Sequence, residues 1–142
     1  WSISAPVKNL TLGSWKAQKQ PFYSWGVSYS KEYEVKSLST PYAVQLNDCK
    51  GTLAEVYVND QKAGIIAYDP YRLDITPYLK EGKNKVDVRV IGSHKNLLGP
   101  HYRHPAPGLA SPWHWKNIDK QIPGSEYQML DYGLMTDFDL VH

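Results

Sequence analysis

The chain has 142 residues, enough for one ordinary domain, and its 16 Lys and Arg residues nearly balance 14 Asp and Glu residues for a net charge of +2. This balance gives no strong electrostatic reason to bind nucleic acid or an anionic membrane, and the apolar runs are too short to span one. A single cysteine excludes an internal disulfide and a thiolate metal cluster, while 42% hydrophobic residues suffice for a folded core.

Short segments in which apolar and polar residues alternate predict β-strands along most of the chain. The first covers 27–35, where Lys31 interrupts the apolar set, so this side chain is expected to lie along apolar surface or to mark a sheet edge. Further strands are predicted at 42–46, 54–58, 63–68, 71–75, 86–90 and 134–141. Many short strands separated by turn residues predict an antiparallel β-sandwich.

A hairpin turn is predicted at Asn59 and Asp60, because both residue types tolerate the positive φ of a tight turn. The turn is flanked by the apolar alternation of Val56 and Val58 on one side and by Ile65 on the other. We therefore expect 54–58 and 63–68 to pair.

The segment after the hairpin has a strand followed by the one helical signal in the sequence. Tyr71 continues the apolar parity of its strand and is predicted to be buried, whereas Arg72 points outward. Asp74 is expected to bind nearby backbone amides and so to order the corner that follows. Thr76 as N-cap and Pro77 as first helical residue predict a single short helical turn.

One long segment, Gly92–Asp131, does not alternate and is rich in Pro, Gly, His and aromatic residues. A connection of about 40 residues is long for a compact domain, and such loops commonly carry function. Its aromatic residues predict an ordered loop that packs on the sandwich.

Several motifs occur in an order and spacing that resemble a known kind of domain. They are Pro21–Tyr29, the hairpin motif Ala54–Gly64, P-Y-R-L-D-I-T at Pro70–Thr76, Leu79–Val90, Asn96–Gly99 and Tyr132–Met135. Together, over about residues 20–140, they resemble the galactose-binding-like jelly rolls that are accessory domains of family 2 glycoside hydrolases and α-L-rhamnosidases. The resemblance implies an all-β, antiparallel jelly roll over residues 1–142, excised from a larger multidomain enzyme. The chain departs from the pattern in having Asp60 where Gly is usual, and in the composition of 92–131, so no ligand residues carry over there.

The aromatic content favours sugar binding, since eleven Tyr and five Trp stand against two Phe. A pyranose ring stacks its apolar face on an exposed aromatic ring, and polar side chains bind its rim of hydroxyls. The candidate carbohydrate-binding residues are His101, Tyr102, Arg103, Trp113, His114 and Trp115 of the long loop, with Tyr23, Trp25 and Arg72 from other loops. Trp113 and Trp115 lead as the stacking platform, because alternate residues of an extended segment share a face. The alternative is that these aromatics anchor the loop to the sandwich.

Signals for metal binding and catalysis are weaker. His101, His104 and His114 lack a recognised zinc spacing, so a solvated or sugar-contacting role is preferred. No cofactor is required. A structural calcium ion stays open without assigned ligands, because the candidate oxygens on Asp48, Asp69, Asp119 and Asp137 are scattered.

Independent catalysis is not expected. A glycosidase needs two carboxylates facing each other across a cleft, and no pair is singled out; Glu126, Asp131 and Asp137 are the least unfavourable candidates. Cys49 is expected to be an inert thiol.

These features predict a non-catalytic carbohydrate-binding module that binds a plant cell-wall polysaccharide and targets an attached glycoside hydrolase. The expected partners are a polysaccharide or oligosaccharide and the tethered catalytic domain, with neither nucleic acid nor membrane. The expected location is secreted, cell-surface or periplasmic, in a bacterium. The alternative is a structural accessory domain that packs on the catalytic domain and binds no sugar, in which case exposed Trp and Tyr side chains form the interdomain interface.

Overall fold

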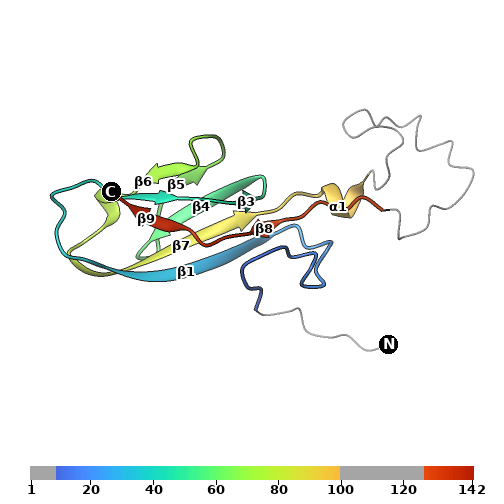
Figure 1. Ribbon diagram of the computed structural model, residues 1–142, viewed down its shortest axis with the longest axis horizontal. Helices are drawn as coiled ribbons and strands as arrows, with labels where there is room; N and C mark the ends of the chain where they lie inside the picture. Colours follow the sequence, from blue (N-terminus) through green and yellow to red (C-terminus); the bar gives the residue numbers. More distant parts are fainter. Residues whose placement is uncertain (1–8, 100–126) are drawn as a thin grey trace, which may run out of the picture.

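The computed structural model describes residues 9–99 and 127–142, which form an all-β domain of antiparallel sheets, as predicted (Figure 1). The strands are β1 (Gly26–Val35), β2 (Ala43–Gln45), β3 (Cys49–Lys50), β4 (Leu53–Val58), β5 (Gln61–Ile66), β6 (Arg72–Asp74), β7 (Gly82–Ile91), β8 (Gly133–Leu134) and β9 (Asp139–Val141). Two short helical segments, η1 (Thr76–Tyr78) and α1 (Lys95–Leu98), complete the described elements. Neither of them has the length or the apolar sequence needed to cross a membrane.

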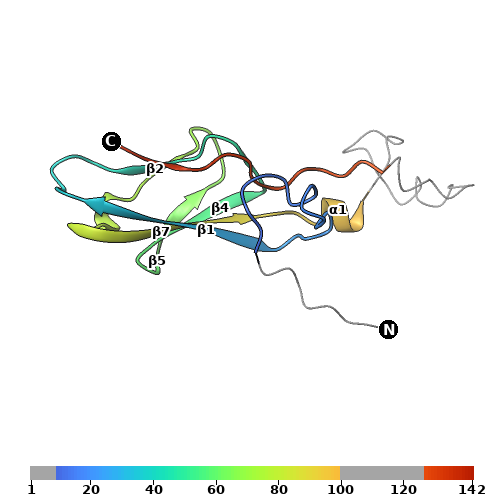
Figure 2. The same cartoon turned by 60° about the horizontal axis from the view of Figure 1, so that its bottom comes forward.

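The strands form the two layers of a sandwich. One layer is the four-stranded sheet β1-β7-β4-β5, the other is the three-stranded sheet β6-β2-β9, and β3 and β8 form a separate two-stranded ladder. The view in Figure 2 separates the layers, with β2 and the C-terminal strand on one side and β1, β7 and β4 on the other. β1 and β7 pair over ten residues, from Gly26 opposite Ile91 to Val35 opposite Gly82, so this ladder sets the length of the larger sheet.

The core confirms the period-two reading of the strands. Val86, Val88 and Val90 of β7 are completely buried, whereas the residues between them face the other side of the sheet. Burial of each Val side chain contributes about 1.5–3 kcal/mol to the free energy of folding. The other layer and its connections supply Val44, Ile75, Leu134 and Phe138 to the same core.

The hairpin between β4 and β5 confirms the turn predicted at Asn59 and Asp60, whose φ angles are 50° and 66°. The two strands of the hairpin are not in simple register, because a bulge after Val56 pairs Val56 with Gly64. The extra residue shifts the inward parity by one, so Ile66 is buried and Ile65 is 48% exposed.

Two strand predictions need correction. Tyr71 is 46% exposed rather than buried, because β6 begins only at Arg72 and the alternation does not extend into the preceding loop. Arg72 points outward, as expected. The strand predicted at 134–141 is divided into β8 and β9, since the amides of Met135 and Thr136 turn to the carbonyl oxygen of Asp48 between them.

The corner after β6 forms through Asp74, as expected. Its carboxylate accepts hydrogen bonds from the amide and hydroxyl of Thr76, at 2.9 and 2.7 Å. The helical turn is a 3₁₀ turn in which Ile75, rather than Thr76, is the N-cap, and Pro77 occupies its first turn. Thr76 instead uses its hydroxyl to join the corner to β2 through Tyr42.

The segment 92–131 differs from a plain loop at its described start, where Lys95–Leu98 forms α1. Buried Asn96 holds this turn in place by donating to the carbonyl oxygens of Pro21 and Leu130, and it accepts from the amide of Leu130. Four residues are too few for a sequence periodicity, and the turn is defined by these distant contacts.

Lys31 confirms its predicted behaviour at the edge strand β1. Its ammonium nitrogen lies 5.5 and 5.3 Å from the ring centroids of Tyr33 and Phe138, and it forms an ion pair with Asp137 at 2.9 Å. This contact joins the first strand to the segment that leads into the last one.

Candidate functional site

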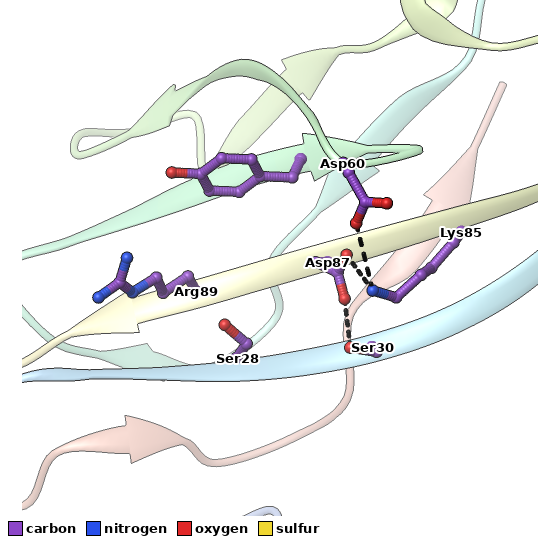
Figure 3. Close-up of a pocket in the computed structure, with 7 residues that line it drawn as sticks. Ser28, Ser30, Asp60, Lys85, Asp87 and Arg89 are labelled. Atoms are coloured by element: carbon purple, nitrogen blue, oxygen red, sulfur yellow. Dashed lines mark hydrogen bonds and ion pairs between the residues drawn. The ribbon is translucent and has the colours of Figure 1, made fainter.

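An open hollow of about 430 Å³ lies on the outer face of the four-stranded sheet (Figure 3). It is lined by Ser28 and Ser30 of β1, Tyr57 of β4, Asp60 of the hairpin turn, and Lys85, Asp87 and Arg89 of β7. The strand residues point outward because each alternates with a core residue on the same strand. The sheet therefore presents hydroxyl, carboxylate and cationic groups on a rigid backbone.

The carboxylate of Asp87 lies at the floor of the hollow and is largely buried. It accepts a hydrogen bond from the hydroxyl of Ser30, and it lies 3.0 Å from the ammonium nitrogen of Lys85. Lys85 also reaches the carboxylate of Asp60 at 3.6 Å. The hydrogen bond and charge of Asp87 raise the pKa of Lys85, so this lysine stays protonated.

A second charged group lies beside the hollow around Glu55 of β4. Its carboxylate accepts hydrogen bonds from the ammonium group of Lys62 at 2.6 Å and from the hydroxyl of Tyr57 at 3.2 Å. The guanidinium group of Arg89 lies 3.8 Å away. The hydrogen bond from Lys62 is the main cause that lowers the pKa of Glu55, so the carboxylate is ionised at neutral pH.

Trp25 extends this surface at the start of β1. The side chain is 67% exposed, and the guanidinium carbon of Arg89 lies 6.0 Å from the centroid of its ring. A cation near the face of an indole is attracted by the ring quadrupole, which holds the ring near the hollow. Arg89 therefore connects an exposed aromatic ring to the polar hollow.

Three of the predicted carbohydrate-binding residues lie in the described part of the chain. Tyr23 packs edge-on against buried Trp15 at 5.5 Å and donates its hydroxyl to the carbonyl oxygen of Gly26, so it supports the start of β1. Arg72 is exposed on β6 and thus belongs to the other sheet from β1, which follows Trp25. Of these three described residues, only Trp25 adjoins the hollow.

The remaining predicted residues lie outside the described residues, so their place relative to the hollow stays a prediction. They are His101, Tyr102, Arg103, Trp113, His114 and Trp115, and with them His104, Asp119 and Glu126 of the metal and catalytic hypotheses.

Acidic residues near the end of the chain are occupied in ion pairs. Asp131 accepts a hydrogen bond from Ser14 and lies 3.2 Å from Lys16, which lowers its pKa, and Asp137 pairs with Lys31. Over 9–99 and 127–142, no three His, Cys, Asp or Glu side chains come close enough together to hold a metal ion.

Cys49 agrees with its expected lack of reactivity. Burial raises the pKa of its thiol to about 11, so the reactive thiolate is scarce at neutral pH.

The residues of the hollow were not among the predicted site residues. Their outward parity was readable in the sequence, where Asp87 and Arg89 alternate with valines. Placing them beside Ser28, Ser30 and Tyr57 requires the strand order, in which β7 lies between β1 and β4.

Comparisons with known proteins relate the chain to large glycoside hydrolases. No protein-family model matches it. Two proteins of Formosa agariphila, each named "Putative beta-glucuronidase", are 29% identical over 112 residues and 38% identical over 74 residues, covering 69% and 50% of the chain. The chain spans only 10% and 9% of these relatives. The solved structure of a rhamnosidase from Novosphingobium sp. PP1Y matches 91% of the chain and 12% of its own, with a TM-score of 0.62 at 22% identity, which shows a shared fold.

Proposed function

We propose that residues 1–142 form a single, non-catalytic domain of a larger, secreted or periplasmic bacterial glycoside hydrolase, and that the domain binds a plant cell-wall polysaccharide. The observation that carries the proposal is the exposed ring of Trp25, which lies over Arg89 at the edge of the polar hollow. The similarity to small parts of large glycoside hydrolases supports an accessory role.

Each part of the surface has a function in this proposal. The indole of Trp25 stacks on the apolar face of one sugar ring. The hydroxyl of Ser28 donates to and accepts from the hydroxyls of the next rings, and the hydroxyl of Tyr57 and the carboxylate of Asp87 accept hydrogen bonds from them. Such contacts give a modest affinity, and the tether then raises the local concentration of the catalytic domain at the polysaccharide.

The segment 92–131 is proposed to be a second sugar-binding element. Trp113 and Trp115 are proposed to form a further stacking platform, with His101, Arg103 and His114 at its edge. The concentration of aromatic residues in 92–131 supports this part of the proposal.

A native affinity gel with a panel of soluble polysaccharides, run with and without a chelator, tests the function. We expect at least one polysaccharide to retard the protein, and Tyr57→Ala in the hollow to weaken the retardation. Tyr68→Ala is the matched control, because Tyr68 is an exposed tyrosine on the loop after β5, outside the hollow. The proposal would be contradicted if no polysaccharide reduced the mobility of the protein below that in a gel without polysaccharide. It would also be contradicted if Tyr57→Ala and Tyr68→Ala changed the retardation equally.

A structural accessory role is the second candidate, and the apolar surface at α1 favours it. Leu97 and Leu98 are exposed on α1, and exposed Phe22 and Leu130 adjoin the two segments that Asn96 ties to it. Such a patch fits docking to another domain. If this role holds, Leu98→Asp should weaken association with the rest of the parent enzyme while no polysaccharide retards the protein.

A further inference from the structure

We infer that the hollow selects uncharged sugar chains over chains of uronic acids. The inference rests on the proposed sugar binding and concerns the class of ligand at the same site. It is carried by the arrangement of charges, because each cation that lines or borders the hollow lies against a carboxylate of the protein itself.

The charged side chains of the hollow and its border have a net charge of zero. Lys85 lies between Asp87 and Asp60, at 3.0 and 3.6 Å. On the other side, Glu55 lies between two cations, Lys62 at 2.6 Å and the guanidinium group of the arginine on β7 at 3.8 Å. Three cations therefore face three carboxylates, and no net positive charge is left for the carboxylate of a ligand.

The rest of the outer face does not change this balance. Along the β1–β7 ladder, Glu34 lies opposite Lys83, and Glu32 lies opposite Lys85. With these residues the outer face carries five acidic and four basic side chains, a net charge of −1. A surface with this charge does not attract a polyanion from a distance.

Binding of a uronate chain in the hollow would be opposed by repulsion between carboxylates. A uronate carboxylate at Lys85 would lie close to the carboxylates of Asp87 and Asp60, and both of these would repel it. The same holds at Glu55, which already accepts hydrogen bonds from Lys62 and Tyr57 and forms an ion pair with Arg89. Repulsion of the wrong ligand is an established source of specificity.

A neutral sugar fits the same groups without this repulsion. The hydroxyl of Ser28 can donate and accept, the hydroxyl of Tyr57, which donates to Glu55, can accept, and the carboxylates of Asp60 and Asp87 can accept from sugar hydroxyls. Hydrogen bonds from a hydroxyl to a carboxylate are charge-assisted and short, so they favour a ligand that brings donors rather than negative charge.

The test compares uncharged and acidic polysaccharides by isothermal titration calorimetry. Galactan, galactomannan and xyloglucan serve as uncharged probes, and polygalacturonate and alginate as acidic probes, at about 20 mM and about 500 mM NaCl. We expect binding to at least one uncharged probe, with less than about a twofold change in Kd between the two salt concentrations, and no binding of the acidic probes in high salt.

Glu55→Gln provides a gain-of-binding test. The change removes the carboxylate shared by two cations, so the hollow and its border gain a net charge of about +1 and affinity for polygalacturonate at low salt should rise about tenfold. Glu34→Gln is the matched control, because it makes the same change of charge on the same face outside the hollow.

Two results would overturn the inference without touching the proposed function. One is that the unmodified protein binds polygalacturonate more tightly than every uncharged probe. The other is that Glu55→Gln and Glu34→Gln raise the affinity for polygalacturonate equally. Absence of binding to every probe would instead refute the proposed function, and the inference with it.

Discussion

Replacing Trp25 with alanine should separate sugar binding from stability. The side chain is 67% exposed, so truncation removes little buried contact. The contact that is lost is with the guanidinium group of Arg89, and an exposed cation–π pair of this kind contributes about 0.5–1 kcal/mol. The free energy of unfolding should therefore fall by no more than about 1 kcal/mol.

The effect on binding should be larger than the effect on stability. By analogy with other flat rings that stack on aromatic side chains, losing the platform costs about 1–3 kcal/mol. This corresponds to a rise in Kd by a factor of roughly 5 to 150. The ring is thus expected to contribute more to the complex than to the free protein.

Trp15→Ala is the matched control, because the same substitution there removes a core residue. Trp15 is buried, donates its indole N–H to the hydroxyl of Tyr29 at 2.9 Å, and packs against Tyr23 and Tyr132. Its truncation should cost about 3–5 kcal/mol of stability.

The assay is a pair of measurements on each variant, urea denaturation for stability and titration calorimetry with the best-binding polysaccharide for affinity. A Trp25→Ala protein that binds within twofold of the parent, or that loses as much stability as Trp15→Ala, would refute the assignment of Trp25 as a platform.

Three further predictions concern stability and pH. Asn84→Ala should cost about 2–4 kcal/mol in urea denaturation, because buried Asn84 binds the amide and carbonyl of Lys80, the carbonyl of Gly82 and the side-chain amide of Asn59; a loss below about 1 kcal/mol would contradict this. Asp60→Gly should be neutral or slightly stabilising, because glycine adopts the positive φ of 66° without strain and the surface ion pair lost is worth little; a loss above about 1 kcal/mol would count against it. Because the folded protein lowers the pKa of Glu55, its contribution to stability is present above the unfolded pKa of about 4.3 and is lost as pH falls through the folded value. The parent should therefore lose more stability than Glu55→Gln between about pH 7 and pH 3, and equal losses would show that Glu55 contributes nothing.

The sequence predicted the strands well where alternation continues without interruption. In β4 and β7 the alternation of apolar and polar residues in the sequence gives directly which side chains point into the core and which point outward. The hairpin turn at Asn59 and Asp60 follows from the tolerance of these residue types for positive φ. The bulge that leaves Ile65 exposed could not be predicted, because it depends on cross-strand pairing, which local residue types do not show. The turn α1 was missed because Asn96 is held by residues distant in the sequence.

The candidate site was only partly predictable for a related reason. Aromatic and charged residue types pointed to sugar binding and included Trp25, but the hollow depends on which strands are neighbours. β1 and β7 are separated by almost fifty residues in the sequence and pair along their whole length, and no local pattern specifies that pairing. The ion pairs that join β7 to β4 and its turn, Arg89 with Glu55 and Lys85 with Asp60, follow from the same strand order.

The alternation of β7 has a consequence for how such a domain can diversify. Its odd-numbered positions carry Lys85, Asp87 and Arg89, which line the hollow, and its even-numbered positions from 86 to 90 carry completely buried valines. Point substitutions can therefore change the chemistry of the hollow while the packed interior stays intact, which makes the strand a suitable target for combinatorial libraries. A single-residue insertion or deletion within it would exchange the two sets and bury the charges, so variation there is restricted to substitutions.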